Sequence, residues 1–265
     1  CEKYGEHLKP KKTSGQAESF GPTACKINKT KTVETTKPEP IHSIPSMIGC
    51  LLWISLRTRP DVAWAVSRAA SLATRDEAQC RTRIKHLLSY LNATSALALS
   101  YTPQSMDVKE IMIYSDASLA PTGSASHEGT VVKLGQHLIT WRSARQSLIA
   151  LSSAEAELIA AVSTTQMTIS VVQPIQELIQ RPLTMHLNID NAAALTMIQK
   201  GYEGAFRSRH ISIRGIFLHD LTKRNLLTCS YCPTEHQAAD ALTKGMSSNE
   251  LSRCVHKHLT LTFDV

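Results

Sequence analysis

The 265 residues are 42% hydrophobic, which is enough for one or two domains with a core, and no apolar run approaches the roughly 18 residues of a membrane span. The net charge of +7 fits a polyanionic partner, although excess basic charge is also common on solvated surfaces and in tails. Seven irregularly spaced cysteines and the absence of a signal peptide favour a reducing, intracellular setting, and a start at Cys1 suggests a piece of something longer.

The first part of the chain is predicted to be a basic arm followed by a small helical unit. Residues 1–42 are rich in Lys, Thr, Pro, Glu and Ser, which predicts a disordered or extended arm. A folded unit over 43–105 begins where the composition changes to IPSMIGCLLWISL, and Pro60 with Asp61 is placed to start the helix VAWAVSRAASLA. A second amphipathic helix, Glu77 to Leu91, has basic outer faces that are either solvated or contact nucleic-acid phosphates. A closing strand is expected near Leu97 to Tyr101.

The second unit, over 108–246, is predicted to have a mixed α/β fold. Strands at 110–116, 129–134 and 137–141, the last two joined by a tight turn, form an antiparallel meander. The chain then alternates between helices and strands, with helix at 153–164, helix at 171–180 cut by Pro174, strand at 185–189, helices at 191–200 and 208–224, and strand at 226–231. This order predicts a mixed sheet flanked by helices, followed by a C-terminal helix or tail over 247–265.

Four carboxylates stand where such a fold can bring them together. Asp116 follows a buried strand, and taken alone it is either a turn residue or a metal ligand. Glu157 lies in the helix SSAEAELIAAV, Asp190 ends the strand MHLNID, and Asp240 is expected at the start of the helix QAADALTK. Like charges in such a cluster need neutralisation, which two Mg²⁺ ions would supply. A pair of ions about 3.5–4 Å apart can clamp both the attacking and the leaving oxygen in phosphodiester cleavage.

The helix offers a choice between Glu155 and Glu157. Residues two apart on a helix differ by about 200° around its axis, so only one of the two can face the site. Glu157 is flanked by small residues that let a helix lie close to a sheet, whereas Glu155 neighbours large apolar ones. We therefore expect Glu157 to face the site.

Several motifs resemble one family of mobile elements. In this order, YSDAS, ITWRSARQSLIALSSAEAELIAA, LNIDNAAA, RSRHISIRGIFLHD and YCPTEHQAADALTK resemble the ribonuclease H domain of copia-type (Pseudoviridae) retrotransposon Pol polyproteins. IPSMIGCLLWISLRTRPDVAWAVSR and IKHLLSYLNATSALALSYT resemble the end of the preceding reverse transcriptase region. The resemblance covers about residues 44–245. It implies a ribonuclease H-like five-stranded sheet flanked by helices, preceded by a small helical C-terminal segment of the reverse transcriptase.

The resemblance also implies a site and a reaction. The family's carboxylates, in the order Asp, Glu, Asp, Asp, correspond to Asp116, Glu157, Asp190 and Asp240, and its glutamate precedes a Leu-x-Ala that selects Glu157 again. The implied reaction is hydrolysis of the RNA strand of an RNA–DNA hybrid by a two-metal mechanism with Mg²⁺, or alternatively Mn²⁺. The implied partners are the hybrid and the rest of the Pol polyprotein, in the cytoplasm or a virus-like particle.

Three further residues are expected near the substrate backbone: Asn191, Arg209 and His210. Arg209 has an equal alternative as an exposed helix start capped by Ser208. The family's polymerase motif of paired aspartates is absent, so no DNA synthesis is expected from this chain alone. Cellular relatives have a histidine on a loop before the last aspartate, and the equivalence of His236 to it stays open.

Other interpretations compete with this one. Cys229 and Cys232 form a CxxC followed by Cys254, His256 and His258, but the pair falls on a predicted strand and the spacing does not match a zinc motif, so no zinc is expected. A transposase or integrase of the same fold would have its glutamate last, whereas here the glutamate is second. The remaining alternative is a catalytically inactive retroelement remnant that only binds nucleic acid.

Overall fold

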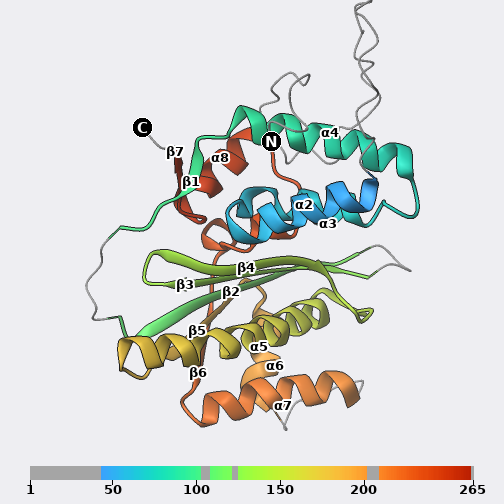
Figure 1. The fold of residues 1–265 in the computed structure, drawn as a ribbon. Helices are drawn as coiled ribbons and strands as arrows, with labels where there is room; N and C mark the ends of the chain where they lie inside the picture. The colour runs from blue at the N-terminus through green and yellow to red at the C-terminus, as the bar shows by residue number, and fades with distance from the viewer. Residues whose placement is uncertain (1–42, 103–107, 121–124, 202–208, 264–265) are drawn as a thin grey trace, which may run out of the picture.

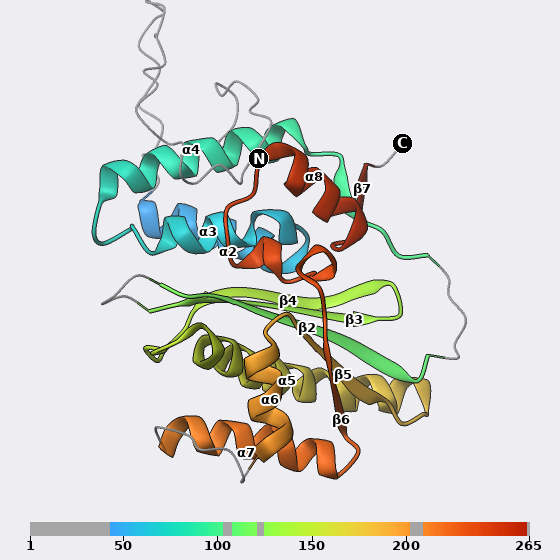
Figure 2. The same cartoon turned by 180° about the vertical axis from the view of Figure 1, so that it is seen from behind.

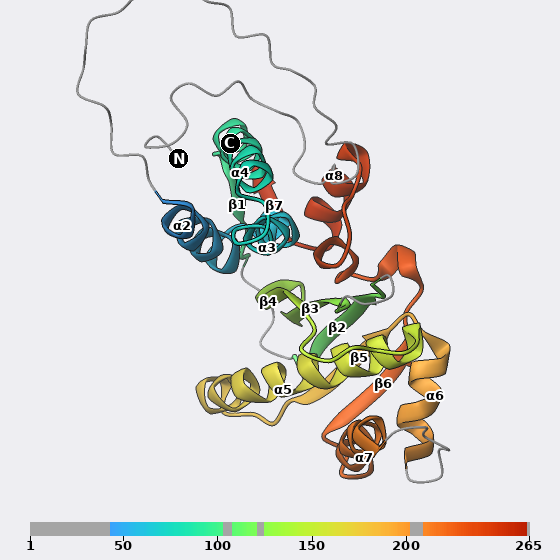
Figure 3. The ribbon, with the colours of Figure 1, turned by 90° about the vertical axis from the view of Figure 1, so that its right-hand side faces the viewer.

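A five-stranded sheet lies between two layers of helices (Figure 1). This computed structural model describes residues 43–102, 108–120, 125–201 and 209–263, so the arm expected over 1–42 lies outside the described residues. Helices α2, α3, α4 and α8 cover one face, and α5, α6 and α7 cover the other, which is seen most clearly from the side (Figure 3). The expected mixed α/β fold is confirmed.

The sheet has the strand order β4-β3-β2-β5-β6. Strands β2 (Glu110–Ser118), β3 (His127–Leu134) and β4 (His137–Arg145) form the expected antiparallel meander. Strands β5 (Thr184–Ile189) and β6 (Leu227–Tyr231) continue the sheet on the other side, with β5 parallel to β2 and β6 parallel to β5. Strand β2 is therefore central, with its backbone held on both edges.

One face of the sheet is covered by α5 (Ser153–Ile179), α6 (Ala192–Lys200) and α7 (Arg209–Lys223). The expected break at Pro174 is wrong, because α5 is one continuous helix of 27 residues with Pro174 inside it. Proline removes one backbone hydrogen bond, but the neighbouring Val172 is buried in the core, and this packing supports the helix through the proline. The apolar core on this face includes Ile111, Ile113, Leu158, Leu187 and Ile189.

Among the described helices, α5 alone is long and apolar enough to cross a membrane, by length and composition only. It exceeds the apolar run expected from the sequence because alanine, valine, isoleucine and leucine raise its mean hydropathy, although serine and threonine interrupt any continuous hydrophobic stretch. Half of the apolar window is buried inside the fold, as in a core helix.

On the other face lie α2 (Ile44–Arg57) and α3 (Ala63–Ala70), and α4 (Glu77–Ala93) packs on these two helices. Helix α4 begins at the expected Glu77 and runs slightly past the expected Leu91, whereas α3 ends at Ala70, before the expected end at Ala73. Ser43 and Asp76 cap α2 and α4 through their side chains. The helix expected to start at Pro60 begins instead with a 3₁₀ turn, η1 (Pro60–Val62). The layer packs on β3 and β4, and the Trp141 indole donates a hydrogen bond of 2.7 Å to the Ser55 carbonyl of α2.

The C-terminal segment returns to this helical layer. The chain leaves β6, crosses the end of the sheet and continues into α8 (Ser248–Lys257) and β7 (Leu261–Phe263), as the view from behind shows (Figure 2). Strand β7 pairs antiparallel with β1 (Leu97–Leu99) in a separate two-stranded sheet. The division into units at about 105 and 246 stays a prediction.

A buried ion pair joins two helices of the layer. Arg59 donates to both carboxylate oxygens of Asp61, at 2.9 and 2.8 Å, and also to the carbonyl and hydroxyl of Thr94. The Tyr90 hydroxyl donates to the same Asp61 carboxylate at 2.9 Å. Arg59 and Asp61 are 6% and 4% exposed, so each charge depends on the other for neutralisation.

Candidate active site

Three of the four expected carboxylates converge at the carboxyl end of the central strand. Asp116 lies on β2, Glu157 in the first turns of α5, and Asp190 directly after β5. One carboxylate oxygen from each of them lies within 4.8 Å of the others. Parallel strands end at the same edge of a sheet, which is why β2 and β5 bring their aspartates together.

Asp240 lies beside this group but is not a member of it. It is the first residue of a 3₁₀ turn, η4 (Asp240–Leu242), and its Oδ2 forms an ion pair of 2.8 Å with Lys244. Its negative charge acts on Asp116, Glu157 and Asp190. The helix expected to start here is wrong: the segment forms two short turns, η3 (Thr234–His236) and η4. Hydrogen bonds from the side chains of Gln237 and Thr243 to the sheet hold this segment in place, and it does not continue as a helix.

The first of these anchors is Gln237. Its buried amide donates to the Ser115 carbonyl at 3.1 Å and to the Asn188 carbonyl at 3.5 Å. These carbonyls belong to β2 and β5, the two strands that hold Asp116 and lead to Asp190. Gln237 therefore fixes the segment that carries Asp240 to the same end of the sheet.

Glu157 faces the cluster and Glu155 does not. Glu157 is 5% exposed, and its Oε1 accepts a hydrogen bond of 3.1 Å from the Ala117 amide on β2. Glu155 instead accepts from the Leu151 amide at 2.9 Å, next to the Ser152 cap of α5. The two side chains diverge as the helical geometry predicts, while the catalytic role of Glu157 stays a prediction.

Burial and mutual repulsion make the cluster hard to ionise. Burial raises the pKa of Glu157 to about 9, and the charges of Asp116 and Asp190 add to this. Burial also raises the pKa of Asp116 to about 6; a hydrogen bond from Thr243 opposes the rise, and the charges of Asp240 and Asp190 add to it. The pKa of Asp190 is raised by burial and by the charge of Asp240. A bound cation would relieve this repulsion.

The donor atoms fit a hard divalent cation. Within the described part of the chain, Glu157 Oε2 and Asp240 Oδ1 are buried without a hydrogen-bond partner. Carboxylate oxygens are the ligands that Mg²⁺ and Mn²⁺ prefer. Burial lowers the pKa of Lys244, but its hydrogen bond to Asp240 and the charges of the cluster outweigh this, so the net pKa is raised. One ammonium group therefore already stands beside the carboxylates.

Two residues that position Asp116 were not predicted. The Thr243 hydroxyl donates to Asp116 Oδ2, and it also lies 3.1 Å from the Asp240 carbonyl. Gly129 pairs with Asp116 across the sheet, and a Cβ atom there would lie 2.7 Å from the Ala239 carbonyl oxygen and 2.9 Å from Leu242 Cβ. Glycine therefore lets η4 approach β3 closely. No local sequence signal pointed to either residue, because both contacts join segments that are far apart in the chain.

The other expected site residues lie outside the carboxylate group. Asn191 caps α6, and its Oδ1 accepts from the Ala194 amide at 3.0 Å, so a substrate contact by its amide stays a prediction. Arg209 and His210 begin α7, and their side chains, like all of Ser208, lie outside the described residues. His236 is exposed, and its Nδ1 lies 3.2 Å from Lys257 Nζ.

The cysteines of the CxxC are structural in their surroundings. Cys229 lies on β6 and is half-buried, while Cys232 is buried. Burial raises the pKa of Cys229 to about 12 and also raises that of Cys232, which keeps both thiols protonated. Neither belongs to the metal-ligand group found among the described residues, which is the carboxylate group.

Comparison with known proteins finds similar sequences in transposon polyproteins. No family model matches it. It is 27% identical over 211 residues to the retrovirus-related Pol polyprotein from transposon TNT 1-94 of Nicotiana tabacum, covering 79% of the chain and 16% of that protein. The polyprotein from transposon RE1 of Arabidopsis thaliana is 27% identical over 76% of the chain and 14% of its own length. The transposon Ty1-DR5 Gag-Pol polyprotein of Saccharomyces cerevisiae is 25% identical over 78% of the chain and 12% of its own length.

Solved structures with a similar fold include ribonuclease H proteins. The N-terminal RNase H domain of Rv2228c from Mycobacterium tuberculosis matches 57% of this chain and 98% of its own, with a TM-score of 0.39 and 12% identity. LC11-RNase H1 in complex with an RNA/DNA hybrid matches 50% of this chain and 93% of its own, with a TM-score of 0.35 and 16% identity. Because these TM-scores are low, the strand order of the sheet remains the basis for the fold.

The sequence matches extend over both layers of the structure, since they cover 76–79% of the chain. The chain spans only 12–16% of the length of these relatives. It is a homologue of the retrovirus-related Pol polyproteins of transposons, consistent with a copia-type Pol fragment.

Proposed function

We propose that the chain is a retrotransposon ribonuclease H, which cleaves the RNA strand of RNA–DNA hybrids during reverse transcription. The observation that carries this proposal is the convergence of Asp116, Glu157 and Asp190, with Asp240 beside them. Homology to transposon Pol polyproteins supports it, since these elements are named as relatives of retroviruses. That this chain contributes the ribonuclease activity of a longer Pol polyprotein is part of the same proposal.

The four carboxylates hold two Mg²⁺ ions, or Mn²⁺ ions, in this proposal. Bound ions would lower the pKa of the attacking water and stabilise charge on the leaving 3′ oxygen. The protein orients the carboxylates: β2 fixes Asp116, the Ala117 amide holds Glu157, and Gln237 anchors the segment of Asp240. The orphaned oxygens Glu157 Oε2 and Asp240 Oδ1 support this assignment because a cation satisfies them where no hydrogen bond does.

The substrate backbone and the polyprotein are the proposed partners. Asn191, Arg209 and His210 contact the hybrid, and the net charge of +7 favours a polyanion. The helical layer of α2, α3 and α4 is the C-terminal segment of the reverse transcriptase, so the remainder of the Pol polyprotein docks nearby. The setting is the cytoplasm or a virus-like particle.

The test is cleavage of a hybrid labelled on its RNA strand, with Mg²⁺ or Mn²⁺. The wild type is expected to release RNA fragments, and Asp116→Asn is expected to release none. Asp220→Asn is the matched control, because Asp220 is an exposed aspartate of α7 paired with Arg224 at 3.5 Å. Cleavage that survives Asp116→Asn, or no cleavage by the wild type with either metal, overturns the proposal.

The competing proposal is that the chain binds nucleic acid and does not cleave it. It would bind the hybrid with a steep dependence on salt concentration and yield no products. Binding and cleavage are therefore measured on the same preparation.

A further inference from the structure

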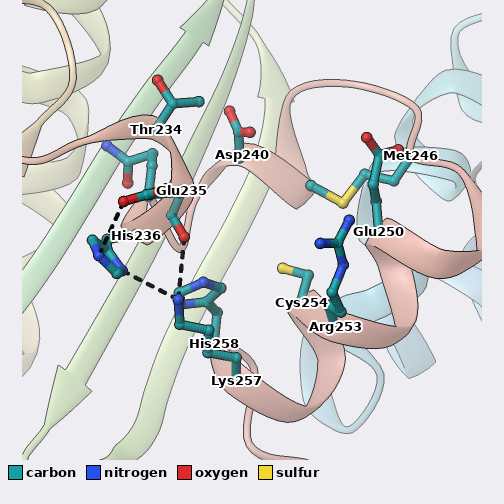
Figure 4. Close-up of a pocket in the computed structure, with 11 residues that line it drawn as sticks. Thr234, Glu235, His236, Asp240, Met246, Glu250, Arg253, Cys254, Lys257 and His258 are labelled. Carbon is teal, nitrogen blue, oxygen red and sulfur yellow. Dashed lines mark hydrogen bonds and ion pairs between the residues drawn. The ribbon is translucent and has the colours of Figure 1, made fainter.

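A cavity of about 460 Å³ lies between the η3–η4 segment and helix α8 (Figure 4). Thr234, His236 and Asp240 line it from the η3–η4 segment, and Arg253, Cys254 and Lys257 line it from α8. This cavity, called the α8 pocket below, is separate in sequence from the carboxylates of β2, α5 and β5.

Two cations of α8 face the α8 pocket. Arg253 and Lys257 are four residues apart, which places them on the same side of the helix. Lys257 Nζ lies 3.2 Å from His236 Nδ1 and 3.4 Å from the Glu235 carbonyl, and neither of these acceptors is a carboxylate. Arg253 has no hydrogen bond or ion pair in the described part of the chain, and none is drawn to it in Figure 4.

No ion pair joins these two cations to an acidic residue in the described part of the chain, although the charge of Arg253 adds to the Ser247 hydrogen bonds in lowering the pKa of Glu250. Glu250 also lines the α8 pocket, but its carboxylate accepts the Ser247 amide at 2.8 Å in the capping box of α8. Glu235 lies on the rim, and its carboxylate is 3.5 Å from the ring of His236. A further anion can therefore be bound by Arg253 and Lys257.

Helix α8 presents these cations from a rigid position. Leu251, Cys254 and Val255 are buried in the core shared with the helical layer. The capping box fixes the start of the helix, and the strand after it, β7, pairs with β1. Side chains on such a support lose little freedom when they bind a ligand.

The α8 pocket adjoins the carboxylate cluster. Asp240 is part of its wall, and the Thr234 hydroxyl, also in the wall, is 3.4 Å from Asp190 Oδ2. A nucleic-acid strand that places one phosphate at the carboxylates has its next phosphates one nucleotide away on either side. Cations on one side of the cluster can thus hold the strand while the cluster acts on it.

We propose that the α8 pocket binds a backbone phosphate of the nucleic acid next to the scissile one, with Arg253 and Lys257 as its cationic ligands. This inference rests on the proposed function, whose substrate it places on the protein. Arginine offers paired donors to the phosphate oxygens, and Lys257 offers a point charge. The C-terminal segment is therefore part of the substrate-binding surface.

The test measures hybrid binding by fluorescence anisotropy in Ca²⁺ over a range of salt concentrations, and cleavage kinetics in Mg²⁺. Arg253→Gln and Lys257→Gln are each expected to weaken binding several-fold and to reduce the slope of log affinity against log salt by about 1. In cleavage they are expected to raise KM and leave kcat nearly unchanged. Arg253→Lys and Lys257→Arg retain the charge and are expected to restore most of the binding.

Arg224→Gln is the matched control, since Arg224 is an exposed arginine directly after α7 whose acidic partner, Asp220, lies four residues earlier. Binding and salt slope equal to wild type in the α8 variants overturn the inference, while cleavage dependent on Asp116 would still support the ribonuclease. A fall in kcat without a rise in KM also overturns it, because the residues would then act through Asp240. Weakened binding with the smaller salt slope in a protein that cleaves nothing supports the α8 pocket and rejects the ribonuclease function.

Discussion

The hydroxyl of Thr243 donates a hydrogen bond to Asp116 Oδ2, joining two residues 127 positions apart in the chain. This bond ties the turn that carries Asp240 to the central strand, and it lowers the pKa of Asp116 against the effect of burial. Thr243 is therefore a positioning residue: it touches a carboxylate of the candidate site and orients it.

Thr243→Val tests this role, because valine keeps the shape and removes the hydroxyl. We expect cleavage to fall about 10- to 100-fold and the Mg²⁺ concentration for half-maximal activity to rise, as for residues that orient metal ligands. A magnesium titration of cleavage checks both effects. The control is Thr196→Val, since Thr196 is exposed and its hydroxyl donates to the Ala192 carbonyl one turn earlier in α6. Unchanged magnesium dependence in Thr243→Val would contradict the assigned role.

Gly129→Ala tests the close approach of η4 to β3. The added methyl group would meet the Ala239 carbonyl oxygen at 2.7 Å, so η4 must move away from Asp116. We expect a loss of about 1–3 kcal/mol in the free energy of unfolding, measured by urea denaturation, and a loss of cleavage.

Gly49→Ala is the matched control for this substitution. Gly49 lies within α2, and a Cβ atom there would meet nothing within 4 Å. Alanine is expected to stabilise the protein by about 0.5–1 kcal/mol at this position. A Gly129→Ala protein as stable and active as wild type would show that η4 does not depend on this contact.

The stability of the metal-free protein is expected to fall as pH rises. Burial raises the pKa of Glu157 from the ordinary 4.5 to about 9, so over this window the folded state binds more protons than the unfolded state. Stability from this group is therefore complete below pH 4.5 and is lost progressively up to about pH 9. Thermal unfolding in EDTA, measured from pH 5 to pH 9, is expected to show the Tm falling as pH rises between the two pKa values of Glu157.

Glu157→Gln is expected to flatten this pH profile because it removes the ionising group and keeps the shape. Added Mg²⁺ at pH 8, within the same window, is expected to raise the Tm of the wild type, since binding to the folded state alone stabilises it. The rise should be smaller in Glu157→Gln. Equal slopes in wild type and variant would show that Glu157 is not the buried acid responsible.

The buried pair of Arg59 and Asp61 supports the helical layer and not the candidate site. Arg59→Met leaves the Asp61 carboxylate buried without its cation, and we expect it to destabilise the protein by about 3–5 kcal/mol. Arg81→Met removes the exposed pair with Glu77 and is expected to cost less than about 1 kcal/mol. Urea denaturation compares the two. Similar small losses in both would mean that the buried pair is not needed for the layer.

Local patterns predicted most of the sheet and the orientation of Glu157. The alternation in β2 and the tight turn between β3 and β4 are short-range signals, and the two strand ends brought Asp116 and Asp190 to one edge. The side of α5 that faces the sheet followed from residues three and four positions from Glu157.

Contacts between distant parts of the chain were beyond such patterns. Gly129 is needed because η4 packs closely on β3 at this position, and the sequence around Gly129 does not predict that contact. The pairing of β1 with β7 joins two three-residue strands, one before and one after all five strands of the main sheet in the chain. The predicted helix break at Pro174 was wrong because packing of the surrounding helix outweighs the low helix propensity of proline.

The path of the chain from β6 to α8 also sets the order in which the candidate site can be completed. All five strands of the sheet are synthesised before Gln237, Asp240 and Thr243 emerge from the ribosome. Asp116, Glu157 and Asp190 can thus meet on a nascent sheet that still lacks its last anchors. The fourth carboxylate lies on the segment that leads to β7, so the packing of this one segment both places Asp240 beside the other three carboxylates and brings β7 to β1.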